Sequence, residues 1–316
     1  MCKNGMILIG TNLASDECQS GVWKGEGVGF YQQEGYPRRF IQAFESPNYF
    51  SNDSACYNGR YMGHCLVTGY WNAFPEFSHA DLIILLGTNP PICHPPFMRE
   101  FADGKERGAK LVVIDPRLNP VACYADIFAQ PYPGTDGALG WGLIRYLIET
   151  KNYDNELVEH YSIGFDKIAA YAKKFTPEYV EKQSGIYSHV VESIAQLIIK
   201  NRPKISIFPG TGLEHHDNGV NSVRAFAILA CLCGNLDISC GLFWPEEMGG
   251  RKLNLYDEIQ LENQKPIGAD RFPALYDICK ECHSMTAMDY MLGNGEYPLK
   301  SLIPVSYTHL RAHETS

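Results

Sequence analysis

The chain has 316 residues, enough for about two domains, and its 45% hydrophobic and 20% charged residues are ordinary for a globular protein. Its net charge of −9, without a basic stripe, argues against nucleic-acid binding, which needs clustered Lys and Arg. The longest apolar runs, such as 82–86, are far shorter than the roughly 20 residues of a membrane-spanning helix, so no direct membrane span is expected.

The eleven cysteines are scattered along the chain and odd in number, which favours reduced thiols over a disulfide framework. Residues 279–283 form a C-x-x-C-H pattern, the attachment motif of c-type haem. Because the pattern occurs once and without other haem signals, we interpret it as ordinary thiols. Residues 1–5 show no signal-peptide or twin-arginine pattern.

Three short apolar runs, at 81–87, 110–116 and 204–210, each end in Gly, Pro or Asp. Such runs are typical of strands that are buried on both faces of a parallel sheet. Between the first two, 97–108 has the length of a three-turn helix that Gly108 closes. The three segments together predict a strand–helix–strand unit.

Further helices are predicted downstream from apolar residues at helical spacing. The first covers 137–150, with Asp136 as its predicted N-cap. The others cover 155–160, 165–175, 177–184, 189–200 and 221–232.

Residues able to bind a ligand follow these predicted strands and open one predicted helix. Open α/β sheets bind ligands at the carboxyl ends of their strands, so the clusters are expected to lie at one edge. The candidate cofactor-binding residues are Gly87, Thr88, Asn89, Asp115, Pro116, Arg117, Gly134, Thr135, Asp136, Gly210, Gly212 and His215.

Each cluster has a chemical interpretation beside a plainer one. Glycines let backbone approach a phosphate, Arg117 offers a planar fork, and Asp136 can accept two hydrogen bonds from guanine. Any one cluster alone is more often a turn or a cap. No G-x-G-x-x-G follows a strand and no G-x-x-x-x-G-K-[ST] occurs, which excludes a simple NAD fingerprint and a P-loop. A plain dinucleotide-binding module, which would bind NAD, stays open as an alternative.

The order of short motifs between residues 40 and 245 resembles the molybdopterin oxidoreductases of the dimethyl-sulfoxide-reductase superfamily. These motifs are Ser46-Pro47-Asn48, Ala80-Asp81, Gly87-Thr88-Asn89-Pro90, Asp115-Pro116-Arg117, Ala125-Asp126, Pro133 to Leu139, and Gly234-Asn235. The resemblance implies molybdenum or tungsten held by two molybdopterin guanine dinucleotides. It also implies that Asn89, Asp115, Arg117, Thr135 and Asp136 contact the dinucleotide.

The family places its protein ligand to the metal shortly after the Ser-Pro-Asn motif, and Cys56 matches the branch that uses a thiolate. A soft thiolate suits a metal already bound by dithiolene sulfur. Ser54 or Asp53 are the alternatives, because other branches use oxygen ligands. A buried, inert thiol is the plainer interpretation of Cys56.

Three residues are candidates for acid–base work. His216 lies where the family often has the His of a Q-H-x-x-G element, here 214–219, and is expected to donate to a pterin or carry a proton. Tyr57 and His64 are close in sequence to Cys56. A capping or core role is the alternative for His216.

The fold class expected is α/β, with two doubly wound dinucleotide-binding-like domains, one inserted in the other. The outer domain comprises 1–52 and 205–305, and the inserted domain 53–204. Residues 306–316 break with the preceding sequence and are interpreted as a non-native tail. The family also has a small N-terminal domain with a 4Fe-4S cluster and a last domain for the second dinucleotide. Neither is matched, so we expect a piece of a longer enzyme that is inactive alone.

The function that the resemblance implies is two-electron redox chemistry, or hydroxyl or oxo transfer, on a small-molecule substrate. An iron–sulfur electron-transfer subunit is the expected partner, in either the bacterial cytoplasm or the periplasm. Residues 218–224 and 233–237 look most like the branch of acetylene hydratase, transhydroxylases and catechol dehydroxylases, with thiosulfate or polysulfide reductase as the rival. A metal-free homologue, such as the large peripheral subunit of NADH dehydrogenase, is the alternative of another class.

Overall fold

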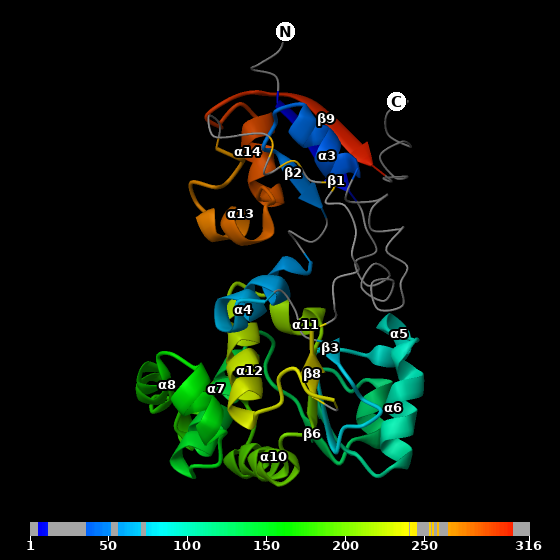
Figure 1. Cartoon of the computed structure of the whole chain (residues 1–316), viewed down its shortest axis with the longest axis vertical. Helices are drawn as coiled ribbons and strands as arrows, with labels where there is room; N and C mark the ends of the chain where they lie inside the picture. The colour runs from blue at the N-terminus through cyan, green and yellow to red at the C-terminus, as the bar shows by residue number, and fades with distance from the viewer. Residues whose placement is uncertain are drawn as a thin grey trace. The chain divides into compact units, whose positions relative to one another are not determined.

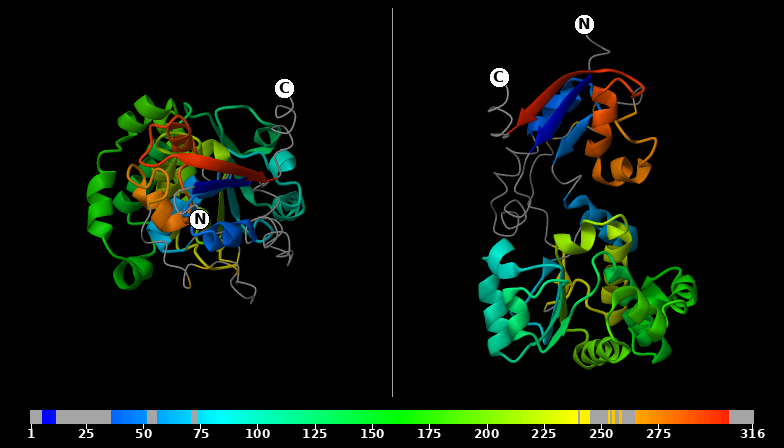
Figure 2. Two further views of the ribbon diagram at one scale, coloured as in Figure 1. Left: turned by 90° about the horizontal axis from the view of Figure 1, so that it is seen from above. Right: turned by 180° about the vertical axis from the view of Figure 1, so that it is seen from behind.

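The structure is a computed structural model that describes residues 6–11, 36–51, 56–70, 74–239, 241–244 and 265–305, with residues 253, 255 and 258. The chain forms two compact units, one of residues 1–58 with 246–316 and one of residues 59–245 (Figures 1 and 2). We call them the outer unit and the inner unit. The described residues contain no helix that is both long and apolar enough to cross a membrane.

The inner unit is organised around one four-stranded parallel sheet in the order β6-β5-β4-β7. The three predicted apolar runs form its central strands and one edge. The strands are β4 (Leu82–Leu86), β5 (Lys110–Ile114), β6 (Ile127–Ala129) and β7 (Ile205–Pro209). The sequence predicts that the outer domain resumes at residue 205. Because β7 pairs with β4, the chain instead stays in the inner unit up to residue 245.

Helices cover both faces of this sheet, which is why its strands read as continuous apolar runs. Leu82, Ile84 and Leu86 point into a core that is completed by three helices, whereas Ile83 between them faces the opposite side. Figure 1 shows α5 and α6 on one side of the sheet and α7, α10 and α12 on the other. These helices are α5 (Pro90–Cys93), α6 (Phe97–Glu106), α7 (Asp136–Glu149), α10 (Ser188–Asn201) and α12 (Gly219–Cys233).

The remaining elements of the inner unit are short. A 3₁₀ helix (Pro120–Tyr124) and a π-helix (Leu157–Tyr161) lie between the larger elements, and the π-helix stands where the sequence predicts an ordinary helix at 155–160. The others are α4 (Asn58–Thr68), β3 (Phe74–Pro75), α8 (Phe165–Ala172), α9 (Pro177–Ser184), α11 (Thr211–Glu214) and β8 (Leu242–Phe243).

The outer unit joins the two ends of the chain through a parallel sheet of order β2-β1-β9. Tyr49 of β2 packs with Ile41 on one face, and Phe50 packs with the cluster around Ile267 and Tyr290 on the other. Its elements are β1 (Met6–Thr11), α3 (Tyr36–Ala43), β2 (Tyr49–Ser51), α13 (Pro273–Cys279), a 3₁₀ turn (Ser284–Thr286), α14 (Ala287–Met291) and β9 (Leu299–Val305). The predicted non-native tail at 306–316 lies outside the described residues.

Candidate functional site

The candidate site lies at the edge of the inner sheet where its parallel strands end. From β4 the chain moves through β5 to β6 on one side, and then returns to place β7 on the other side of β4. The strand order therefore reverses between β4 and β7, and open α/β sheets bind ligands at such a point. The loops 87–89 and 210–212 follow these two strands.

The glycines of these loops allow two backbones to touch. A Cβ on Gly210 would lie 2.5 Å from the Gly87 carbonyl oxygen and 2.5 Å from the Thr88 Cβ. A Cβ on Gly212 would lie 2.9 Å from the same carbonyl, and Gly87 itself has a φ of +55°. From the sequence, these glycines are predicted to make room for a phosphate. The structure supplies a different reason for them, because close packing of the two loops already requires glycine.

Asn89 presents a buried acceptor at the end of β4. The side chain is 6% exposed, and its Oδ1 finds no hydrogen-bond partner among the described residues. Asn89 precedes α5 without capping it through its side chain. A buried amide oxygen left without a donor is costly, so such an atom is a natural contact for a ligand N–H or O–H group.

Asp115 is fixed by a local network at the end of β5. Its Oδ1 accepts the Arg117 backbone N–H at 2.8 Å, and its Oδ2 accepts Asn119 Nδ2 at 2.9 Å. Asn119 Nδ2 also lies 3.4 Å from the Thr88 carbonyl oxygen. The network therefore ties the loop after β5 to the loop after β4.

Asp136 is a buried acid at this edge, and its pKa is shifted. The sequence predicts it as the N-cap of α7, but Thr135 occupies the cap and Asp136 is the first helical residue. It is 4% exposed, and burial raises the pKa of its carboxyl to about 6. His216 and Asp115 both lie within electrostatic reach, and His216 lowers that pKa while Asp115 raises it. No other described side chain hydrogen-bonds to Asp136.

His216 packs beside the loop that leads into α7. A Cβ on Gly134 would lie 3.3 Å from His216 Nδ1, and Asn218 Nδ2 donates to the Gly134 carbonyl at 3.0 Å. The loop after β7 therefore meets the start of α7, which brings His216 and Asp136 to the same part of the site.

The other predicted contacts at this edge are more open. Arg117 is exposed and makes no ion pair with a described residue. Pro116 and His215 are also exposed, and the Thr135 hydroxyl donates to the Tyr132 carbonyl at 2.6 Å. These groups lie where a ligand would meet solvent, at the rim of the buried set.

The predicted metal ligand belongs to the outer unit. Cys56 is half-buried, and Tyr57 beside it is buried. Both directly precede α4, which begins at Asn58. Ser54 and Asp53, the alternative ligands, lie outside the described residues. Among the described residues no group of three or more His, Cys, Asp and Glu side chains is placed to hold a metal ion. A metal at Cys56 would therefore need further ligands that the described residues do not supply. The sulfur atoms of a dithiolene cofactor could supply them.

His64, the third acid–base candidate, lies in the inner unit on α4. It is buried, and burial together with the Arg60 charge lowers its pKa to about 4. The imidazole is therefore neutral at pH 7, and its Nδ1 has no hydrogen-bond partner among the described residues. Its environment is that of a core histidine rather than a solvent-linked proton carrier.

The sequence did not reveal a buried ion pair between α4 and α11. Arg60 donates to Glu214 Oε1 at 2.7 Å through its guanidinium and to Oε2 at 2.6 Å through its backbone N–H. Glu214 directly precedes the Q-H-x-x-G-like element, in which His215 stands at the Gln position and His216 at the His position, and no sequence signal singled Glu214 out. The pair holds the start of α4 against the loop that carries His215 and His216.

The C-x-x-C-H pattern is not a haem site. Cys282 is 1% exposed and its thiol pKa is raised well above the ordinary value, chiefly by burial. Cys279 is half-buried. A thiol enclosed in this way cannot reach a haem vinyl group. Glu281, between them, is a second buried acid that the sequence did not single out.

Comparison with known proteins gives a consistent family. The molybdopterin oxidoreductase family model matches residues 36–259. The chain is 34% identical over 176 residues to the F420-dependent formate dehydrogenase subunit alpha of Methanocaldococcus jannaschii, covering 55% of this chain and 26% of that protein. It is 28% identical over 245 residues to acetylene hydratase of Syntrophotalea acetylenica, covering 75% of this chain and 33% of that protein.

A solved structure shows the same fold. Acetylene hydratase from Pelobacter acetylenicus superposes with a TM-score of 0.78 at 21% identity, covering 87% of this chain and 41% of that one. The chain thus spans between about a quarter and two fifths of the relatives that it matches. Members of the matched family are oxidoreductases that hold a molybdenum or tungsten pterin cofactor. On the family match over most of its length, this chain belongs to the molybdopterin oxidoreductases.

Proposed function

We propose that the inner unit binds one guanine dinucleotide of a molybdenum or tungsten bis-molybdopterin cofactor at the carboxyl edge of its sheet. One observation carries the proposal: Asp136 is a buried carboxyl at the strand-order reversal of a doubly wound sheet, and no side chain of the described residues hydrogen-bonds to it. A guanine base presents two N–H donors on one edge, which match a carboxylate. Such donors would satisfy a carboxylate that receives no hydrogen bond from a side chain in the described part of the chain.

The neighbouring residues fit the rest of a nucleotide. Asn89 Oδ1 receives no hydrogen bond from the residues that the structure describes, so it can accept one from a hydroxyl or an amine. Arg117 is exposed at the rim, where a guanidinium can pair with a phosphate. The cofactor-contacting set also includes Thr88, Thr135 and His215 at the same edge. Gly87, Gly134, Gly210 and Gly212 would shape the site mainly by letting its loops pack closely.

Cys56 is proposed as the protein ligand to the metal, because thiolate sulfur suits a metal held by dithiolene sulfur. When bound, the cofactor would supply two-electron redox chemistry or hydroxyl or oxo transfer on a small substrate. His216 is exposed and close to Asp136, so it can hold or release a proton at the rim. Tyr57 stays a prediction for acid–base work, and the buried, neutral His64 has the weakest support.

Substrate and partners follow only by likeness. The alignment with acetylene hydratase covers more of this chain than the alignment with the formate dehydrogenase subunit, which favours hydration or hydroxyl transfer. Thiosulfate or polysulfide reduction remains the rival. The 4Fe-4S cluster and an iron–sulfur electron-transfer subunit stay predictions.

The nucleotide site can be tested with guanosine diphosphate and adenosine diphosphate as probes. Titration calorimetry on the chain should show GDP binding about tenfold more tightly than ADP, since adenine lacks the paired donors. Asp136→Asn should abolish this preference, because an amide cannot accept both hydrogen bonds. Asp126→Asn is the matched control, because Asp126 is an exposed carboxylate of the same unit. Equal binding of the two nucleotides, or tight NAD binding, would refute the proposal.

A further inference from the structure

Glu281 is a buried acid in the segment that follows α13 of the outer unit. The helix ends at Cys279, and the capping residue Lys280 has a left-handed φ of +56°, a turn that directs the next residue inward. The Cys282 N–H donates to the Tyr49 carbonyl at 2.8 Å, which fixes the segment beside β2. Glu281 is only 3% exposed as a result.

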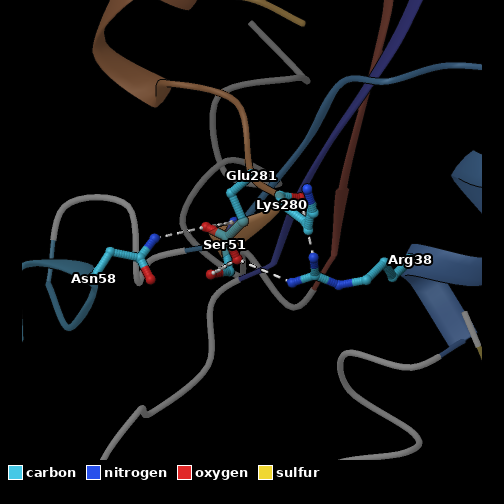
Figure 3. Close-up of polar contacts among 5 residues, drawn as sticks. All are labelled: Arg38, Ser51, Asn58, Lys280 and Glu281. Atoms are coloured by element: carbon cyan, nitrogen blue, oxygen red, sulfur yellow. Dashed lines mark hydrogen bonds and ion pairs between the residues drawn. The ribbon is translucent and has the colours of Figure 1, made fainter. Parts of the chain in front are cut away.

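The carboxylate of Glu281 accepts hydrogen bonds from three different segments (Figure 3). Oε1 accepts from Ser51 Oγ at 2.9 Å and from the Arg38 guanidinium at 3.2 Å. Oε2 accepts from Asn58 Nδ2 at 3.1 Å and lies 3.4 Å from the Ser51 backbone nitrogen. Arg38 also donates to the Lys280 carbonyl at 3.1 Å. We call these contacts the Glu281 clamp.

Two of these donors stand at the two ends of the segment that carries Cys56. Ser51 is the last residue of β2, and Asn58 is the first residue of α4. The residues between them are 52–57. One carboxylate therefore fixes both the point where the chain leaves the sheet and the point where it enters the helix.

A carboxylate side chain suits this position, because it can accept hydrogen bonds at both of its oxygens. Carboxylate acceptors form shorter and stronger hydrogen bonds than neutral ones. Burial of a lone carboxylate would be costly, and Arg38 with the two polar side chains offsets that cost. The arginine is itself held over the Tyr49 ring, with 4.3 Å from its Cζ to the ring centroid.

We propose that Glu281 is a positioning residue that sets the place of the Cys56 thiol by holding residues 51 and 58. The relevance of that thiol to a metal rests on the proposed function. The clamp itself is a property of the outer unit and needs no cofactor.

The test uses the full chain without cofactor and the variant Glu281→Gln. Glutamine keeps the size but offers one acceptor oxygen, and its N–H₂ group must face a donor of Arg38 or Asn58. Alkylation of Cys56 by iodoacetamide, followed by peptide mass spectrometry, should become about tenfold faster as the two anchors loosen. Amide hydrogen exchange should rise in the peptide spanning residues 51–58. Cys65, half-buried in the inner unit, should keep its rate.

Three further variants separate positioning from general destabilisation. Ser51→Ala and Asn58→Ala should each give part of the effect, and neither should add much to Glu281→Gln. Glu281→Asp, which keeps the charge, should recover part of the protection. Asp289→Asn, at an exposed acid of the outer unit, should change nothing.

Unchanged Cys56 alkylation and exchange in both Glu281→Gln and Asn58→Ala would overturn the clamp. So would an equal rise at Cys56 and Cys65, which would mean general unfolding. Because these measurements involve no metal or nucleotide, failure of the nucleotide titration would leave them unaffected, and the two proposals can fail separately.

Discussion

The inner and outer units each contain an ion pair between an arginine and a buried glutamate, but the two pairs differ in what supports the acid. Glu214 of the inner unit receives its hydrogen bonds from the backbone and guanidinium of a single residue, Arg60. Glu281 of the outer unit receives them from Arg38, Ser51 and Asn58. An acid with several neutral donors can lose its cation more cheaply than one that depends on a single arginine. In the outer unit, the hydrogen bonds of Glu281 join segments that lie up to 243 residues apart in the sequence.

The largest expected effect therefore comes from removing Arg60. Arg60→Met removes the guanidinium from the buried Glu214 and leaves the backbone N–H of residue 60 as its described donor, and breaking such a pair costs about 3–5 kcal/mol of unfolding free energy. Arg38→Met should cost less, about 1–2 kcal/mol, because Ser51 and Asn58 still donate to Glu281. Urea unfolding followed by hydrogen exchange in each unit measures both. Equal losses would show that the two acids are supported alike.

The buried His64 should make the inner unit sensitive to acid. Its pKa in the folded state lies below that of the unfolded chain, so the contribution of His64 to stability is greatest above pH 6.5 and falls as the pH falls toward 4. His64→Leu should remove this loss, which amounts to up to about 3 kcal/mol. His189→Gln, at an exposed histidine, is the control. An unchanged acid-unfolding profile in His64→Leu would contradict the assignment.

Two acids of the inner unit should respond to pH with opposite sign. The raised pKa of Asp136 means that its own contribution to stability is greatest below pH 4 and falls as the pH rises through about 6. Asp136→Asn should therefore stabilise the unit at pH 8 by about 2 kcal/mol. The pKa of Asp126 is lowered by Lys110, the Leu111 N–H and Lys105, against the effect of burial. Asp126→Asn should therefore destabilise slightly at pH 8, by less than about 1 kcal/mol. Unfolding free energies of the same sign would refute this contrast.

The smallest effect concerns thiol reactivity. A hydrogen bond with the His94 side chain lowers the pKa of Cys93, although burial opposes it, whereas burial raises the pKa of Cys65. Iodoacetamide should therefore label the exposed Cys93 faster than the half-buried Cys65 at pH 7.5, with the difference widening as the pH falls. Faster labelling of Cys65 would be the contrary result.

The inner sheet could be predicted from sequence because its information is local. Strands such as 82–86 are buried on both faces and read as continuous apolar runs, and the helix at 177–184 begins after a Thr cap, contains Pro in its first turn and ends at Gly185. The strand-end clusters followed from the rule that ligands bind at carboxyl ends. Their chemical environment did not follow, since the burial that raises the pKa of Asp136 depends on the tertiary fold.

The outer unit shows where such prediction stops. Its strands come from both ends of the chain, and the pairing of β1 with β9 has no local signature. Glu281 sits in a pattern that suggests haem, and only the long-range contacts to Ser51 and Asn58 reveal its place. The predicted ligand Cys56 rested on register after Ser46-Pro47-Asn48. Its position in the fold is consistent with that role and does not test it.

The most direct test is the metal content of the protein purified from the organism that makes it, measured by elemental mass spectrometry together with X-ray absorption at the metal edge. Stoichiometric molybdenum or tungsten is expected, in a sulfur-rich coordination sphere. Cys56→Ser should keep the metal, because the dithiolenes still hold it, while losing one sulfur neighbour. Protein without either metal would contradict the enzyme assignment and favour a metal-free structural homologue.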